Sequence, residues 1–176
     1  MQQKIHRMEQ FFNMSLNELE HSLTETRSVL NNIRGDRSAF SVALTDSRWC
    51  LGPFRTNTTI VYTHVFLNLG SNYDPASGVF VAPRSGVYVL SLTVYSDSGS
   101  AGTLLAACAT LTVNDVAVAV LRDWNSQDQE DSSTSVVALK LYAGDRVRVL
   151  LPAGCFLCDN NNHYNTFTGF LLYATD

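Results

Sequence analysis

Residues 60–92 constrain the fold of this chain more than any other stretch of it. Two apolar runs, 60–66 and 87–92, flank a centre that is dense in turn-forming residues. These turn formers are Asn68, Gly70, Asn72, Asp74, Pro75, Gly78 and Pro83. They supply positive or fixed backbone angles and local side-chain caps, whereas the valine, tyrosine and leucine of the runs fit a pleated sheet. The stretch therefore predicts a strand, a turn, a short strand, a second turn and a strand.

The residues before Gly35 follow a different period. Two seams repeat every seven residues, with Leu16, Leu23 and Leu30 on one and Ile5, Phe12, Leu19, Thr26 and Ile33 on the other. Such a heptad stripe predicts a coiled-coil helix, with an amphipathic helix packed on its own domain as the alternative. Gly35 is a suitable helix stop, and residues 35–38 form a short linker. We therefore expect a helix and linker over 1–38 and a globular domain over 39–176.

The expected globular domain reads as short strands throughout. Turn signals recur about every ten residues, among them Asn114-Asp115 and residues 143–146. Long polar loops are expected at 123–135 and 152–165. No helical period lies between the strands, which argues against a parallel α/β sheet. The pattern predicts an all-β sandwich or jelly roll.

Charge and apolar run length exclude several classes of function. The formal net charge is −4, and phosphate-binding proteins are usually basic, so a nucleic-acid partner is not expected. No apolar run approaches the roughly 18 residues that a membrane span needs. The first ten residues lack the apolar centre of a signal peptide. This leaves a cytoplasmic chain or a mature fragment with an added Met1, and we favour the fragment.

Catalytic motifs are missing from the sequence. It contains no nucleophile elbow, no phosphate-cradling glycine loop and no paired-histidine metal motif. We therefore expect a protein that is not an enzyme.

The central stretch resembles the signature of the complement C1q globular domain. The positions that carry the resemblance are Tyr62, Asn68, Tyr73, Phe80, Gly86, Tyr88, Leu90 and Leu92. Tyr62, Leu90 and Leu92 depart from the residues usual in the family but keep an apolar face. Three further segments, 111–115, 139–149 and 167–173, resemble the family in the same order.

The resemblance implies a ten-stranded jelly roll, similar to tumour necrosis factor, that assembles as a tight trimer. It also implies that the heptad stripe forms a trimeric coiled coil. Because the chain has no Gly-X-Y repeats, it is similar to the cerebellins and other secreted, collagen-free members rather than to complement itself.

For function, we expect a secreted homotrimer whose heads bind a protein or glycan on a cell, matrix or microbial surface, gaining strength from multivalency. A lectin-like, carbohydrate-binding defence protein and a structural matrix scaffold are the alternatives. The expected contacts lie in or beside the two polar loops. They are Asp123, Trp124, Asp128, Glu130, Asp131, Phe156, His163 and Tyr164. For the rings among them, the alternative is that they only pin their loops to the sheet.

The four cysteines, at positions 50, 108, 155 and 158, permit three complete pairings. In a secreted chain we expect disulfides, with Cys155–Cys158 first and Cys50–Cys108 as the second bond. Alternatives are a free buried thiol at Cys108 and a zinc site of Cys155, Cys158 and His163, which lacks a second cysteine pair.

Two kinds of accessory site remain open. The carboxylates of Asp123, Asp128, Glu130 and Asp131 are the oxygen ligands that calcium prefers, although a solvated loop is favoured, so no cofactor is expected. Asn13 and Asn57 each begin an N-glycosylation triplet.

Overall fold

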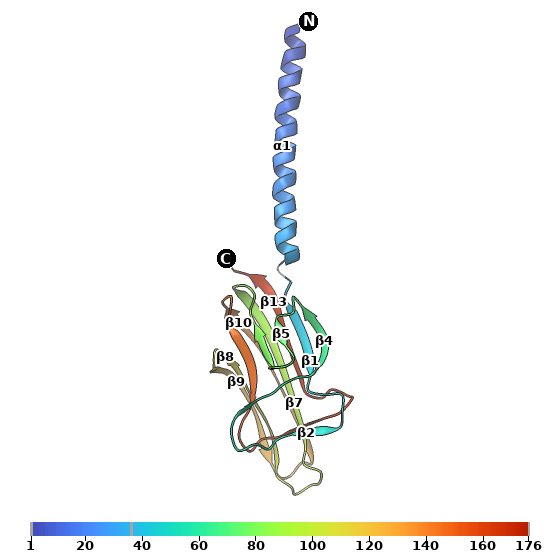
Figure 1. The fold of residues 1–176 in the computed structure, drawn as a ribbon, viewed down its shortest axis with the longest axis vertical. Helices are drawn as coiled ribbons and strands as arrows, with labels where there is room; N and C mark the ends of the chain where they lie inside the picture. Colours follow the sequence, from blue (N-terminus) through green and yellow to red (C-terminus); the bar gives the residue numbers. More distant parts are fainter. Residues whose placement is uncertain (1, 36, 176) are drawn as a thin grey trace. The chain divides into compact units, whose positions relative to one another are not determined.

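The computed structural model describes residues 2–35 and 37–175 (Figure 1), except for the side chains of 31–35. It divides into two units, Met1–Asp36 and Arg37–Asp176. Of the features expected from the sequence, Asp36 of the linker and the side chain of Ile33 lie outside the described residues.

The first unit is one helix, α1, which runs from Gln2 to Gly35 and includes the whole heptad stripe. The described apolar seam side chains are between 48% and 71% exposed; they are Ile5, Phe12, Leu16, Leu19, Leu23 and Leu30. The predicted helix is confirmed, and its assembly into a coiled coil stays a prediction. No helix among the described residues is long and apolar enough to cross a membrane.

The second unit is a sandwich of two antiparallel sheets. The first sheet has the order β10-β7-β13-β1-β4. Its strands are β1 (Ala39–Ala43), β4 (His64–Leu69), β7 (Gly86–Asp97), β10 (Glu130–Leu141) and β13 (Thr166–Ala174). β7 lies inside this sheet, paired along its whole length with β10 on one side and from Gly86 to Thr93 with β13 on the other.

The second sheet has the order β5-β6-β11-β8-β9. Its strands are β5 (Tyr73–Asp74), β6 (Val79–Val81), β8 (Leu105–Val113), β9 (Val116–Asn125) and β11 (Arg146–Leu151). Three short strands add to these ten within the described residues. β3 (Thr58–Thr59) pairs with β11, and β2 (Trp49–Leu51) pairs with β12 (Leu157–Asp159). The predicted ten-stranded jelly-roll sandwich is confirmed.

An aromatic cluster fills the space between the two sheets. The ring of Phe40 lies 5.3 Å from Tyr73, 4.7 Å from Phe80 and 4.8 Å from Phe167, measured between centroids. All four side chains are at most 1% exposed. Phe40 thus connects β1 to strands of both sheets, and the stacked and edge-on pairs add to the burial free energy.

Several positions of the C1q-like signature have a direct structural role. Asn68 closes the turn between β4 and β5, because its amide donates to the Tyr73 carbonyl at 2.8 Å and its oxygen accepts the Tyr73 N–H at 3.2 Å. The Tyr73 hydroxyl in turn holds both backbone groups of Tyr62, each at 3.1 Å, and burial raises the pKa of Tyr73 to about 12. A β-carbon on Gly86 would lie 2.6 Å from Leu171 and from the Tyr173 carbonyl, so this position has no room for a side chain.

The segment expected as a loop at 123–135 is mostly strand. β9 continues to Asn125 and β10 begins at Glu130, so 126–129 alone connect them. The reason is pairing: every residue of β10 from Glu130 to Leu141 faces a partner on β7. The small hydroxyl residues of 132–135 fit this ladder, and Thr134 shares a 2.9 Å hydrogen bond with Thr93 across it. The expectation of a loop here was wrong.

The expected loop at 152–165 also contains a strand, β12, whose three residues are all buried. In the central stretch, the predicted strand over 60–66 begins only at His64. The turn predicted at Asn114-Asp115 is confirmed, since both residues have positive φ, at 48° and 69°, and they join β8 to β9.

We predict that Phe40→Ala lowers the free energy of unfolding by about 3–5 kcal/mol, because it removes the ring shared by both sheets. The matched control is Phe54→Ala, which deletes a ring that is 39% exposed and should cost less than about 1 kcal/mol. Urea unfolding followed by circular dichroism measures both. Equal losses in the two variants would contradict the central role of Phe40.

Candidate functional site

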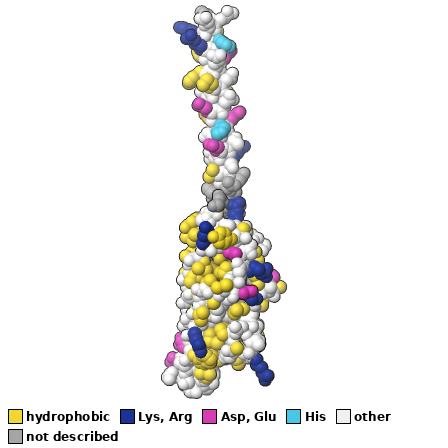
Figure 2. All heavy atoms as spheres, turned by 90° about the vertical axis from the view of Figure 1, so that its left-hand side faces the viewer, with side chains coloured by type: hydrophobic (Ala, Val, Ile, Leu, Met, Phe, Trp, Pro, Cys, Tyr) yellow, Lys and Arg dark blue, Asp and Glu magenta, His cyan; other side chains and the backbone are white. Residues whose placement is uncertain are grey.

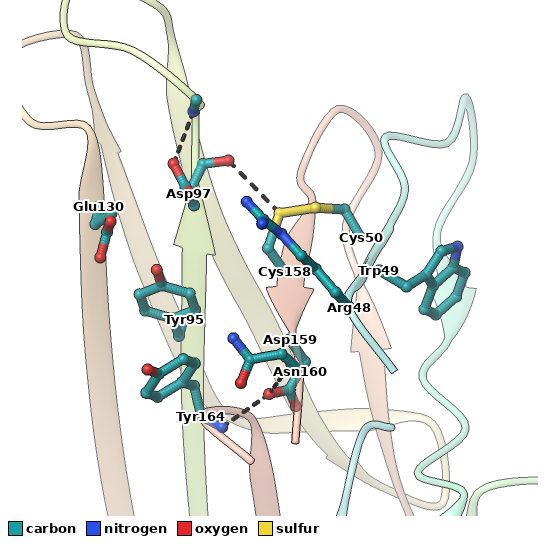
Figure 3. Close-up of a pocket in the computed structure, with 11 residues that line it drawn as sticks. Arg48, Trp49, Cys50, Tyr95, Asp97, Glu130, Cys158, Asp159, Asn160 and Tyr164 are labelled. Atoms are coloured by element: carbon teal, nitrogen blue, oxygen red, sulfur yellow. Dashed lines mark hydrogen bonds between the residues drawn. A yellow bond between two sulfur atoms is a disulfide. The ribbon is translucent and has the colours of Figure 1, made fainter. Parts of the chain in front are cut away.

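A pocket of about 700 Å³ opens at one end of the sandwich. Its walls come from β2, β12, the end of β7, the start of β10 and the residues just after β12 (Figure 3). This is the end of the domain away from its two chain ends, because Ala174 pairs with Gly86 at the start of β7, whereas Asp97 in the pocket ends that strand.

A buried carboxylate organises the floor of the pocket. Asp159 is 3% exposed, and its oxygens accept the backbone N–H groups of Asn160 at 2.9 Å, Tyr164 at 2.8 Å and Asn165 at 3.3 Å. Asn165 is fully buried; it accepts the Tyr95 N–H at 2.8 Å and donates to the Cys158 carbonyl at 2.7 Å. A polar network satisfied in this way is rigid, so the side chains above it are held in place.

A disulfide between Cys50 and Cys158 forms one wall. The antiparallel pairing of β2 with β12 places these two residues directly opposite each other. The second disulfide joins Cys108 on β8 to Cys155. The expected Cys155–Cys158 and Cys50–Cys108 pairings were therefore wrong.

The physical reason is that β12 begins between Cys155 and Cys158, so each cysteine has a different strand as its neighbour. Cys158 faces β2, whereas residue 156, next to Cys155, donates its N–H to the Ala106 carbonyl of β8 at 3.0 Å. The alternatives of a free Cys108 thiol and of a zinc site on Cys155, Cys158 and His163 are also wrong, because a disulfide sulfur is no longer a thiolate ligand.

The open side of the pocket combines rings with charged groups. The rings of Tyr95 and Tyr164 lie 4.6 Å apart, and Trp49 is 50% exposed. Burial, followed by the neighbouring Glu130 carboxylate, raises the pKa of Tyr95, which therefore stays a neutral hydroxyl. Figure 3 shows Arg48 lying across the disulfide with its guanidinium on the side of Asp97.

These groups determine what the pocket can bind. Asp97 and Glu130 can accept hydrogen bonds from hydroxyl or cationic groups, and the rings can pack against an apolar face. Because charged and amide side chains outnumber the rings in its lining, the pocket is more polar than a usual small-ligand site and suits a polar ligand.

The structure brings two of the eight predicted contact residues into this pocket, Glu130 and Tyr164. Trp124 lies on β9, where the Arg122 guanidinium stacks 4.3 Å from its ring, and lines a separate pocket of about 280 Å³. Phe156 is half-buried beside β8. His163 stacks on His64, with 4.3 Å between ring centroids.

The predicted calcium candidates do not all gather at one point. Glu130 and Asp131 are neighbours on a strand, so their side chains point to opposite faces. Glu130 lines the pocket, whereas a hydrogen bond with Asp123, with a contribution from Asp128, raises the pKa of Asp131. Calcium binding by the four carboxylates stays a prediction, secondary to the favoured solvated loop.

Both N-glycosylation positions are exposed. Asn13 lies on α1, and Asn57 lies just before β3, where its side-chain oxygen accepts the Ala153 N–H at 3.1 Å. Glycan attachment at either position stays a prediction.

Most of the pocket was not found by the reasoning from sequence. The missed residues are Arg48, Trp49, Tyr95, Asp97, Asp159 and Asn160. They come from three segments that are distant in sequence. The correct pairing of Cys50 with Cys158 would have brought two of these segments together, and the register of β7 with β10 would have set Asp97 of the third segment opposite the predicted contact residue Glu130.

Comparison with known proteins shows a consistent family. A family model described as the C1q domain matches residues 39–172. Caprin-2 of Danio rerio is 31% identical over 142 residues, which are 78% of this chain and 14% of Caprin-2. Complement C1q tumor necrosis factor-related protein 3 of Mus musculus is 29% identical over 119 residues, which are 68% of this chain and 46% of that protein. The chain therefore spans less than half the length of these curated relatives.

Solved structures share the fold at low identity. The globular domain of zebrafish complement 1qA protein is 20% identical with a TM-score of 0.60, and the match covers 79% of this chain and 99% of that domain. Murine APRIL at pH 8.0 is 14% identical with a TM-score of 0.55, over 77% of this chain and 99% of that one. At these identities the likeness is one of fold alone.

We predict that a non-reducing peptide map of the chain contains two cross-linked species, one joining Cys50 to Cys158 and the other joining Cys108 to Cys155. The digest must cut between 155 and 158, for example after Phe156 or Leu157. A reduced sample is the control, in which both species disappear. A peptide that links Cys155 to Cys158 would contradict this assignment.

Proposed function

This chain belongs to the C1q domain family, and we propose that it is part of a secreted, homotrimeric recognition protein that binds surface ligands without catalysing a reaction. The observation that carries the proposal is a pair of exposed apolar surfaces on opposite sides of the domain. The absence of catalytic motifs from the sequence supports the proposal that the protein binds its ligand without catalysing a reaction.

The first surface, the β4/β13 surface, extends over the first sheet from its edge strand β4 across β1 to β13. Its members are Val65, Leu67, Leu69, Phe170, Leu172 and Tyr173, each between 39% and 56% exposed. β4 is the edge strand of the sheet. Apolar groups clustered in this way usually mark a contact with another molecule.

The second surface, the β9/β10 surface, lies at the other edge of the sandwich. Its members are Val116, Val118, Val120 and Val136, each between 36% and 67% exposed. Figure 2 looks onto the side of the domain where β8, β9 and β10 lie in Figure 1, and hydrophobic side chains gather over it. β10 and β4 are the two edges of one five-stranded sheet, so the surfaces face different directions.

Two different surfaces on one domain favour head-to-tail assembly. If the β9/β10 surface of one copy covers the β4/β13 surface of the next, the contact is heterologous, and such contacts close into a ring when the rotation allows it. Three copies match the trimer that the family resemblance implies. The exposed heptad seam of α1 supports the same assembly, because partner helices would cover it.

The disulfides support secretion. Cys50–Cys158 and Cys108–Cys155 use all four cysteines of the chain. Disulfides persist in oxidising compartments and are rare in reducing ones.

Trimerisation would set the mode of binding. In a ring with cyclic symmetry all copies point the same way along the axis, so three pockets at the free ends of the domains would face one surface. Weak sites that engage together gain strength through effective concentration.

A second candidate function is lectin-like binding of carbohydrate. The specific observation in its favour is the combination of two tyrosine rings, Tyr95 and Tyr164, with the carboxylates of Asp97 and Glu130 in one pocket. Rings pack against the C–H face of a sugar, and carboxylates accept hydrogen bonds from its hydroxyls.

We predict that the chain sediments at equilibrium as a trimer, and that Leu172→Asp and Val120→Asp each weaken this trimer more than tenfold. Both substitutions place an unpaired carboxylate in a proposed contact, which costs several kcal/mol. Ala101→Asp, which adds the same charge in an exposed turn, is the matched control and should leave the trimer intact. A monomeric parent chain would contradict the proposal, and assembly beyond a trimer would favour a matrix scaffold.

We also predict that the chain binds neutral glycans on a glycan array and that Tyr164→Ala reduces this signal at least tenfold, because it removes one ring of the pair. Trp124→Ala removes a ring of similar exposure from the other sheet and should leave the signal unchanged. An array without any signal would exclude the lectin-like candidate and leave protein ligands.

A further inference from the structure

A cluster of metal-ligand side chains lies outside the pocket. Asp46, His64 and His163 each offer one ligand atom, and among the described residues these atoms lie within 4.8 Å of one another. They come from the segment after β1, the first residue of β4 and the segment before β13. The two imidazoles and the carboxylate therefore meet through the tertiary fold and not within a single turn.

The cluster centres on one carboxylate oxygen. Asp46 Oδ1 lies 2.7 Å from His64 Nδ1 and 3.4 Å from His163 Nε2. Ligands bound at about 2.0–2.1 Å to a tetrahedral ion are about 3.3–3.4 Å apart. To bind one ion, the stacked imidazole rings would have to rotate so that both lone pairs converge, and the 2.7 Å separation between Asp46 and His64 would have to widen.

A hydrogen bond to one ring nitrogen of His163 determines which of its two nitrogens is free to bind a metal ion. His163 Nδ1 lies 3.2 Å from the Thr45 carbonyl oxygen, and a carbonyl can only accept, so Nδ1 carries a hydrogen. In the neutral imidazole the lone pair is then on Nε2, which points at Asp46 Oδ1. Two acceptors facing each other need a cation between them, either a proton or a metal ion. Metal-binding histidines are commonly oriented by a bond of this kind to a backbone carbonyl.

The backbone holds His163 in place before any ligand arrives. Its φ is +57°, a left-handed conformation that is uncommon for residues other than glycine, and such conformations persist only where the surroundings fix them. Here the neighbouring residue, Tyr164, is anchored to the buried Asp159 carboxylate.

The surroundings resemble those of a partly enclosed site. The two imidazole rings stack with 22° between their planes, and the ring of Phe66 packs edge-on against both, at 4.5 Å and 5.1 Å. The His64 and His163 side chains are 29% and 19% exposed, whereas Asp46 is 63% exposed. The site is thus apolar on one side and open to solvent on the other.

We propose that Asp46, His64 and His163 bind a divalent transition-metal ion, with Zn²⁺ as the first choice. Imidazole suits zinc, copper, nickel and iron, whereas calcium and magnesium prefer sites made only of oxygen. Binding displaces the hydrogen on His64 Nδ1, which moves to Nε2 or to solvent. Three protein ligands leave a fourth position for water or for a carboxylate or imidazole of another molecule. This site is separate from the pocket and does not depend on the proposed function.

The alternative occupant is a proton. A protonated imidazole would satisfy the same geometry as an ion pair with Asp46, with no metal involved. Metal titration distinguishes the two states, because a site that is only a His–Asp ion pair takes up no stoichiometric metal ion.

The test is isothermal titration of Zn²⁺ into the full, chelator-treated chain. We expect one Zn²⁺ per chain, visible d–d absorption when Co²⁺ replaces it, and no comparable heat with Ca²⁺. Asp46→Asn, His64→Gln and His163→Gln should each weaken Zn²⁺ binding by about 100-fold, at or above the loss caused by removing second-shell partners. Zinc should also raise the unfolding midpoint of the parent chain and not that of the variants.

The matched controls are His6→Gln and His21→Gln. Each of these helix histidines lies near one glutamate, Glu9 or Glu25, at 3.8 Å and 4.0 Å, so each offers a single imidazole and a single carboxylate. Zinc uptake should be unchanged in both. The proposal is overturned if the parent chain takes up no Zn²⁺ at micromolar concentration, or if uptake persists in a His64→Gln/His163→Gln double variant that unfolds, without metal, at the same midpoint as the parent.

Discussion

The rest of the domain depends on the two-sided pairing of β7. Its residues from Gly86 to Asp97 face β10 on one side, and those from Gly86 to Thr93 face β13 on the other. This register turns Tyr88, Leu90 and Leu92 into the core and, because the strand continues without a break, brings Tyr95 and Asp97 to the pocket. A slip of one residue would exchange the two faces of the strand, so the core and the candidate site are fixed by the same hydrogen bonds.

The buried Asp159 connects the pocket to the metal-ligand cluster. Its carboxylate holds the backbone of Asn160 and Tyr164, and from this anchored segment Tyr164 lines the pocket while His163 reaches His64 and Asp46. Two neighbouring residues thus serve different sites, and the backbone between them has a positive φ at His163. Burial of a carboxylate is costly unless its oxygens are satisfied, and here the backbone donors satisfy them.

Local sequence patterns predicted the elements that are formed by residues close together in the sequence. The heptad seams predicted α1, and the turn-forming residues of 60–92 predicted the turn that Asn68 closes. Strand pairing was not predictable in the same way. Residues 130–135 carry no apolar alternation, so their place in β10 follows only from their register with β7. The predicted disulfide pairing was wrong for the same reason. Cys158 is positioned by its pairing with β2, about a hundred residues away in the sequence, and not by the nearby Cys155.

This difference between local patterns and long-range pairing also explains why the fold is easier to infer from the sequence than the ligand. The core needs apolar volume at inward positions, and several residues supply it, as Leu90 and Leu92 do where the family signature usually has rings. A binding site instead needs particular polar atoms at particular distances, and here those atoms belong to segments that meet only after folding. Asp46, His64 and His163 are a clear case: no spacing in the sequence relates them, yet one carboxylate oxygen lies within 3.4 Å of a nitrogen of each imidazole. Chemistry of this kind can be read only from the folded chain.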